Sequence, residues 1–296
     1  MAAPKKHRIL VNDSHLTVYE WGAPLADKPS VIFFHATGFH ARCWDGVIRH
    51  LDCVHCYAVD ARGHGTSDKP EPPHGWVQYG RDAAEVAKAL GLKGAIGVGH
   101  SMGGNSLTRA AATESDVFSA LVLIDPVIMP RAMYVLPDYS IEGHFVLKRR
   151  REWASADEMF TRFKGRGAFA QWQDDILRDY CEYGLLPNED GEEGYVLACA
   201  PEVEAHIYSS SVLASNIDIY DAIAKIMIPV RLLRCAKFLS DRNDMLGSPT
   251  APDLATTFEN AADIPLQNNT HFIPMESPQL VAQHIRELLQ ENRQHQ

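Results

Sequence analysis

Short, nearly continuous apolar runs recur along the chain, and segments with helical periodicity separate them. The runs V-I-F-F, A-I-G-V and A-L-V-L-I are typical of strands in a parallel sheet that is covered on both faces. Helices are expected at residues 82–90, 102–113 and 278–290. This alternation predicts an α/β fold, with a mostly parallel sheet of about eight strands flanked by helices. The expected strands cover residues 7–11, 16–20, 30–35, 54–60, 94–99, 120–125, 229–235 and 263–267.

The alternation stops between residues 129 and 225, where the chain is charged, aromatic and helix-like. Because the run at 229–235 resumes the earlier pattern, we expect a helical cap of residues 129–225, inserted after the sixth strand. Residues 1–128 and 226–296 would then form the core domain; an independent second domain is the alternative. The cap aromatics are expected to line a substrate pocket, while several of them pack as the core of the cap: Trp153, Phe160, Phe163, Phe169, Trp172, Tyr180 and Tyr183.

Composition narrows the class of partner. The 296 residues are 46% hydrophobic and 22% charged, which is ordinary for a globular protein. The formal net charge of −10 disfavours nucleic acid and anionic membrane surfaces, because both attract a basic face. The first residues lack the apolar stretch of a secretion signal, and no run of about 18 apolar residues predicts a membrane span. A cytoplasmic protein that acts on a small molecule is therefore expected.

Two local patterns invite a function that their context does not support. Cys53 and Cys56 are three residues apart on an expected strand, so their side chains point to opposite faces and would chelate a metal poorly. Buried thiols are the better interpretation, and no metal or organic cofactor is expected. The charge run K-R-R-R at residues 148–151 is typical of a solvated helix face, and it is given no function.

The stretch G-V-G-H-S-M-G-G-N, residues 97–105, lies between an expected strand and an expected helix. Ser101 falls in the tight turn between them, which is the context that a G-x-S-x-G motif requires. Such a turn strains the backbone of the serine and leaves no room for side chains at Gly99 and Gly103. The backbone N–H of Met102 would lie at a helix N-terminus, where it can stabilise an oxyanion.

Three further segments follow expected strands. F-F-H-A-T-G-F, residues 33–39, stands where a second oxyanion N–H would arise. D-A-R-G-H-G-T-S, residues 60–67, is expected to brace the neighbouring loop rather than to react. T-H-F-I-P-M, residues 270–275, precedes the last helix, and His271 there has the position that a general base requires.

Together these residues resemble the α/β-hydrolase superfamily, and the resemblance extends from residue 7 to the final helix. It implies an esterase- or lipase-like serine hydrolase with Ser101 as nucleophile, His271 as general base and a carboxylate as third member of a triad. The oxyanion loop departs from the usual His-Gly pattern, since it reads His35-Ala36. The second oxyanion donor is then Thr37, with the neighbouring Ala36 and Gly38 as alternatives.

The sequence leaves the triad acid open between two places. Asp125 ends the strand that follows the nucleophile helix, while Asp241 and Asp244 come late in the loop after the strand at 229–235. We favour Asp125, because a strand end places a side chain more rigidly than a loop does. Asp244 and Asp241 remain alternatives.

The implied chemistry is hydrolysis of a carboxylic ester or lactone of a small, largely apolar substrate through an acyl-enzyme. A serine at position 101 excludes the aspartate-dependent dehalogenase and epoxide-hydrolase reactions of the fold. Cleavage of C–C bonds in diketone-type compounds and cofactor-free perhydrolysis use the same triad and stay open. A small-molecule receptor with this fold is the alternative from another class, and a single burst without steady turnover would indicate it.

Overall fold

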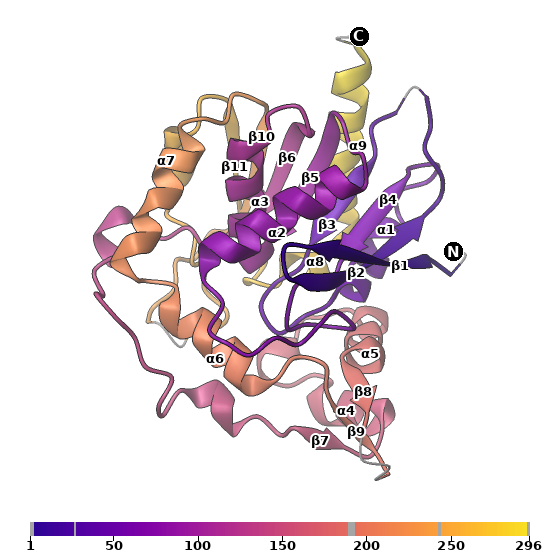
Figure 1. The fold of residues 1–296 in the computed structure, drawn as a ribbon, viewed down its shortest axis with the longest axis vertical. Helices are drawn as coiled ribbons and strands as arrows, with labels where there is room; N and C mark the ends of the chain where they lie inside the picture. The colour runs from indigo at the N-terminus through magenta and orange to yellow at the C-terminus, as the bar shows by residue number, and fades with distance from the viewer. Residues whose placement is uncertain (1–2, 27, 189–192, 242–243, 295–296) are drawn as a thin grey trace.

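The computed structural model describes residues 3–26, 28–188, 193–241 and 244–294. An eight-stranded sheet in the order β1-β2-β4-β3-β5-β6-β10-β11 runs through it (Figure 1). All eight expected strands are present in this sheet, with ends shifted by at most a few residues. They are β1 (Lys5–Val11), β2 (Ser14–Trp21), β3 (Val31–Phe34), β4 (Cys56–Val59), β5 (Ala95–His100), β6 (Phe118–Ile124), β10 (Val230–Cys235) and β11 (Ala261–Leu266).

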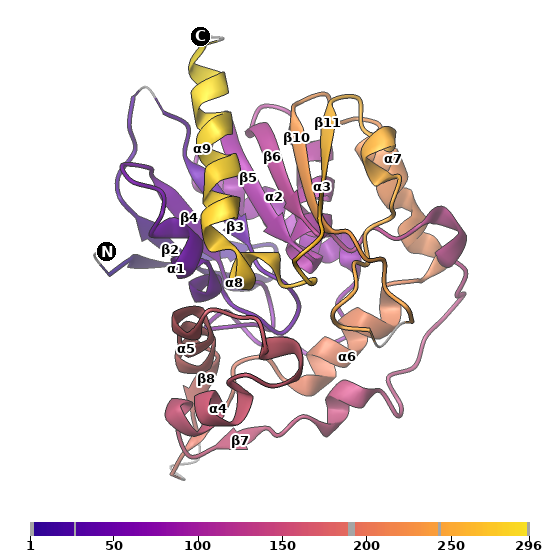
Figure 2. The same cartoon turned by 180° about the vertical axis from the view of Figure 1, so that it is seen from behind.

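The sheet is parallel from β4 to β11, and the β1–β2 hairpin extends it in antiparallel pairing. Every residue of β3, β4 and β5 is buried, as expected for strands covered on both faces. Helices α2 (Trp76–Ala89) and α3 (Met102–Thr113) cover one face. Helices α1 (Asp45–Ile48) and α9 (Pro278–Gln294) cover the other, which Figure 2 shows from behind.

Helix α2 begins six residues before the expected start at residue 82. It follows Gly75, and its first turns bury Trp76, Tyr79 and Gly80. Gly80 packs against Arg109 of α3, where a Cβ atom would lie 2.5 Å from the Cβ of the arginine. This glycine thus allows the two helices to approach closely.

The connection between β6 and β10 adds no strand to the central sheet, within the part of it that the structure describes. Most of it lies beyond one end of the sheet, in the lower half of Figures 1 and 2, and its last helix returns to the side of the sheet. It is helix-rich as expected, but it also holds a small antiparallel sheet in the order β7-β9-β8. Its elements are α4 (Ala156–Phe163), α5 (Asp174–Tyr183), α6 (Pro201–Ser210), α7 (Ile219–Ile223), β7 (Glu152–Trp153), β8 (Leu185–Pro187) and β9 (Tyr195–Leu197).

The last helix of this connection, α7, packs on α3 and belongs to the same apolar cluster as the central sheet. The shorter helices are α8 (Ile273–Glu276), η1 (Ala41–Trp44), η2 (Arg131–Met133), η3 (Phe145–Lys148), η4 (Gly167–Phe169), η5 (Ala214–Asp218) and η6 (Leu254–Thr257). Among the described residues, no helix combines the length and the apolar character that crossing a membrane requires.

Candidate active site

The serine turn has the geometry that the sequence predicts. Ser101 joins β5 to α3 with φ 56° and ψ −115°, a strained conformation for a residue with a side chain. A Cβ atom on Gly99 would lie 2.5 Å from the carbonyl oxygen of Gly103. One on Gly103 would lie 2.2 Å from the carbonyl oxygen of Phe34. The expectation that both glycines must lack side chains is confirmed.

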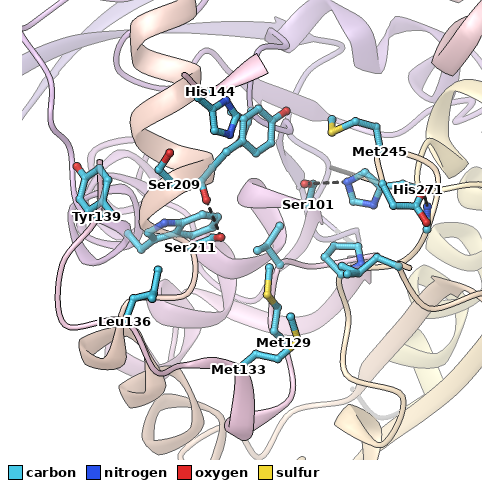
Figure 3. A pocket seen from close by; sticks show the side chains of 18 of the residues that line it. Ser101, Met129, Met133, Leu136, Tyr139, His144, Ser209, Ser211, Met245 and His271 are labelled. Carbon is cyan, nitrogen blue, oxygen red and sulfur yellow. Dashed lines mark hydrogen bonds between the residues drawn. The ribbon is translucent and has the colours of Figure 1, made fainter. Parts of the chain in front are cut away.

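Ser101, His271 and Asp125 form a continuous hydrogen-bonded chain. His271 Nε2 lies 3.0 Å from Ser101 Oγ (Figure 3), and His271 Nδ1 lies 2.7 Å from Asp125 Oδ2. The carboxylate accepts the Nδ1 proton, so Nε2 is left to accept the proton of the hydroxyl. Asp125 is fully buried, whereas Ser101 and His271 line a cavity. The arrangement can therefore activate the serine toward a molecule in that cavity.

Three groups besides His271 hold the carboxylate of Asp125. Its Oδ1 accepts hydrogen bonds from the backbone N–H of Cys235, 3.2 Å away, and from the hydroxyls of Ser248 and Thr250. Sequence reasoning did not identify Ser248 and Thr250, because nothing in the loop after β10 marks them as partners of a residue more than 120 positions earlier. Together these donors orient the carboxylate toward the histidine.

The two alternative acids lie elsewhere. Asp244 accepts hydrogen bonds from the backbone N–H groups of Ser240, Leu246 and Gly247, at 2.9–3.1 Å, and these lower its pKa to about 2. Its carboxylate closes the loop that follows β10. Asp241 is exposed in the same loop. Of the three candidates, Asp125 is the one whose hydrogen bond with His271 the structure records.

The expected oxyanion residues lie on both sides of the serine. Met102 is the first residue of α3, where the backbone N–H carries the partial positive charge of a helix N-terminus. Thr37 lines the same cavity as Ser101. Gly38, with φ 77°, is turned toward α6, since a Cβ atom there would lie 2.7 Å from Glu204 Oε2. Neither Ala36 nor Gly38 is among the described residues that line the cavity at Ser101, which favours Thr37 as the second donor.

The segment at residues 60–67 braces the oxyanion loop, as expected. Asp60 Oδ1 accepts the N–H of Ala41 at 2.7 Å, and Oδ2 accepts the N–H of Thr66 at 2.8 Å. The ring of His35 accepts the N–H of Ala61 at 3.0 Å through Nε2. Burial lowers the pKa of His35, so the ring stays neutral and can accept this bond. These contacts fix the segment at residues 60–67 relative to the loop that follows β3.

The cavity at the serine has a volume of about 490 Å³ and a largely apolar wall. Met129, Met133 and Leu136 lie on one side of it, and Tyr139 and Ser209 lie opposite His271 (Figure 3). Among the described residues, no lysine or arginine lines this cavity.

The expected pocket aromatics of residues 153–183 do not line the cavity at Ser101, although Trp153, Phe163, Phe169 and Tyr180 line a second cavity next to it. Trp153, Trp172 and Tyr180 are buried in one apolar cluster. That cluster includes Phe39 and Phe272, with ring centroids of Phe39 and Trp172 5.6 Å apart. Aromatic side chains bury more surface when they pack against one another than when they line a pocket. The sequence alone does not show which aromatic residues pack in a core and which line a pocket.

The sequence is similar to those of known α/β hydrolases. The model of the alpha/beta hydrolase family matches residues 31–284. A 2-(acetamidomethylene)succinate hydrolase from Mesorhizobium japonicum is 27% identical over 262 residues, which cover 87% of this chain and 86% of that protein. A non-heme chloroperoxidase from Streptomyces lividans is 38% identical over 96 residues. A bifunctional esterase/perhydrolase from Acinetobacter calcoaceticus is 32% identical over 111 residues. These last two matches span 34% and 40% of the relatives' length.

Solved structures share the fold. The crystal structure of an E-2-(acetamidomethylene)succinate hydrolase superposes with a TM-score of 0.70 at 23% identity, covering 96% of this chain and 98% of that one. A peroxisomal α/β-hydrolase from Saccharomyces cerevisiae superposes with a TM-score of 0.77 at 16% identity, covering 100% and 91%. With the sheet order, the serine turn and a family match over most of the chain, this protein belongs to the alpha/beta hydrolase family.

Proposed function

We propose that this protein is a serine hydrolase that cleaves a carboxylic ester or lactone of a small substrate. Ser101 is the nucleophile, His271 the general base and Asp125 the acid that orients the histidine. The proposal rests above all on one observation: the hydrogen-bonded chain of these three residues ends at a cavity of about 490 Å³. Residues 129–225 are proposed as the cap that closes over this cavity.

The reaction proceeds in two steps. His271 Nε2 takes the proton of Ser101 as Oγ attacks the acyl carbon, and the N–H groups of Met102 and Thr37 stabilise the oxyanion. The imidazolium then gives its proton to the leaving alkoxide, and an acyl-enzyme remains. Water, deprotonated by His271, attacks the acyl carbon and releases the acid. Loss of one oxyanion donor typically lowers the rate by about 10²–10³.

The lining of the cavity favours a substrate whose group next to the reacting carbonyl is uncharged. Its charged side chains among the described residues are Asp138 and Asp244, and both are carboxylates. A carboxylate of the substrate would meet no cation there. The succinate in the name of the Mesorhizobium relative therefore does not carry over to this cavity.

Perhydrolysis on the same triad is a second candidate. The partial match to a bifunctional esterase/perhydrolase, 32% identical over 111 residues, favours it. In that reaction hydrogen peroxide replaces water as the group that attacks the acyl-enzyme, and a peroxy acid leaves. The amount of peroxy acid formed per ester cleaved, measured over a range of peroxide concentrations, separates the two reactions.

The test is steady-state hydrolysis of p-nitrophenyl esters from acetate to octanoate. We expect sustained turnover by the wild type and a loss of at least 10³-fold in kcat for Ser101→Ala. Ser209→Ala is the matched control, because it makes the same change in the wall of the same cavity and should keep kcat within a few fold. A single burst without turnover would favour the receptor alternative. Absence of any ester cleavage, with cleavage of a diketone, would favour C–C hydrolysis.

A further inference from the structure

A second cavity of about 400 Å³ adjoins the one at Ser101. The two cavities share Thr37, Tyr208 and Met245 in their walls. They therefore meet at the oxyanion loop, where the proposed reaction places the acyl carbon. An ester has two arms, one on each side of this carbon, so one arm can enter each cavity.

The charges of the two cavities differ in sign. The described residues that line the second cavity include the cations Lys148, Arg149, Arg150 and Arg162, against one carboxylate, Glu204. The first cavity has carboxylates and no cation among its described lining residues. The run K-R-R-R at residues 148–151 does not form a solvated helix face as expected: Lys148 ends η3, the three arginines follow that helix, and Arg149 is partly buried.

Two of these cations are already paired with carboxylates. Arg149 pairs with Glu204, whose side chain is 3% exposed, and its Nη2 donates to the hydroxyl of Tyr180 at 3.0 Å. Arg150 pairs with Glu158, with Nη2 3.1 Å from Oε2. Lys148 and Arg162 are exposed and line the cavity, so the lining carries an excess of positive charge after both pairs are discounted.

Trp153 and Arg150 form one side of the second cavity. The side chain of Trp153 is 3% exposed, and the guanidinium of Arg150 lies over its ring, with Cζ 4.4 Å from the centroid. This contact and the ion pair with Glu158 hold Arg150 in the wall of the cavity.

Flat aromatic surfaces line the same space. Phe163 and Phe169 are stacked with centroids 4.4 Å apart and ring planes 10° apart, and Trp153 meets Phe163 edge-on at 5.4 Å. Aromatic rings bind planar groups through stacked or edge-to-face contacts. The shape of the wall thus favours a planar group, while the charge of Lys148 and Arg162 favours an anion.

We propose that the second cavity binds one arm of the substrate, and that this arm is a planar group carrying a carboxylate. The inference rests on the proposed function, because the reacting carbonyl is placed at Thr37 between the two cavities. The substrate then has an uncharged apolar arm in the first cavity and an aryl or conjugated carboxylate in the second.

Binding is measured without turnover in Ser101→Ala protein, by titration calorimetry with 2-naphthoate and with its uncharged analogue 2-naphthamide. We expect the carboxylate to bind at least tenfold more tightly than the amide. Lys148→Gln with Arg162→Gln should weaken naphthoate about tenfold and leave naphthamide within twofold. Arg166→Gln is the matched control, because this exposed arginine of the same segment does not line the cavity.

Equal affinities for the two naphthalenes, or an equal loss in the Arg166→Gln control, would overturn the inference. Wild-type kinetics separate this from failure of the proposed function. Hydrolysis of neutral p-nitrophenyl esters without charge-dependent naphthoate binding rejects the second arm and leaves the hydrolase proposal intact. Charge-dependent binding without hydrolysis of any ester rejects the hydrolase proposal, and with it the role of the bound carboxylate as a substrate arm.

Discussion

The side chain of His100 is hydrogen-bonded to the backbone of His271. His100 Nε2 lies 2.9 Å from the carbonyl oxygen of His271, and since a carbonyl only accepts, the ring nitrogen is the donor. Burial lowers the pKa of His100 well below its usual value, so the ring is neutral. The residue before the proposed nucleophile thus fastens the loop that carries the proposed base.

His100→Leu should damage both stability and catalysis. It removes the donor and leaves a buried carbonyl without this bond, at a cost of about 1–3 kcal/mol. We expect a lower melting temperature and a kcat reduced about tenfold, because the ring of His271 loses a support of its position. His100→Gln is the control, since its amide can still donate. If the two variants have the same melting temperature and the same ester kinetics, the hydrogen bond of His100 does not support the position of His271.

The acid is tested by comparing two conservative changes. Asp125→Asn puts an amide where the histidine needs an acceptor, so the wrong ring nitrogen keeps the proton. We expect kcat to fall by about 10⁴ with little change in KM. Asp244→Asn disturbs only the loop bonds of that carboxylate, and kcat should stay within about tenfold. A larger loss in the second variant would reverse the assignment.

The serine turn is predicted to tolerate no methyl group at Gly103. Its Cβ atom would lie 2.2 Å from a backbone oxygen of β3, so the helix or the strand must move. Gly103→Ala should lower the free energy of unfolding by at least about 3 kcal/mol, as overpacking of backbone against backbone implies. Gly75→Ala, where no atom lies within 4 Å of the added methyl, should change it by less than about 1 kcal/mol. Urea denaturation followed by circular dichroism measures both.

A pH-dependent stability term is expected from Asp179 on α5. Burial and the nearby carboxylate of Asp45 raise its pKa to about 6, and they outweigh the ion pair with Arg49 at 3.2 Å. Because the folded pKa lies above the unfolded one, the stabilising contribution is complete below about pH 4 and is lost as pH rises through 6.

Asp179→Asn should therefore be more stable than wild type at pH 7.5, by about 1 kcal/mol, and equal to it near pH 4. Asp174→Asn is the control on the same helix, since its side chain is 61% exposed. Melting temperatures between pH 4 and 8 measure the difference. A gap between Asp179→Asn and wild type that does not widen with pH would contradict the expectation.

The sequence allowed most of the sheet and two members of the site to be predicted, because their signals are local. A buried parallel strand is a short apolar run, and the serine turn is marked by a motif that lies within nine residues. His271 was recognised by its place before the last helix. Each of these features depends on neighbours in the chain.

The features that could not be settled depend on contacts between distant segments. Asp125 was favoured for its rigid place, but Ser248 and Thr250, which hold its carboxylate, belong to a loop without a recognisable pattern. The same holds for the pocket wall, where methionines and tyrosines took the place expected of Trp153 and its neighbours. Charge alone did not reveal that Arg149 is paired with a buried glutamate.

The position of Asp125 at the end of β6 has a consequence for redesign. The loop between β10 and η6 supplies Leu239, Met245 and Pro249 to the cavity at Ser101, but it carries none of the three proposed catalytic side chains. Randomising these three positions while Ser248 and Thr250 stay fixed would vary substrate preference without altering the bond-breaking groups. This loop is a natural segment for a library of new selectivities.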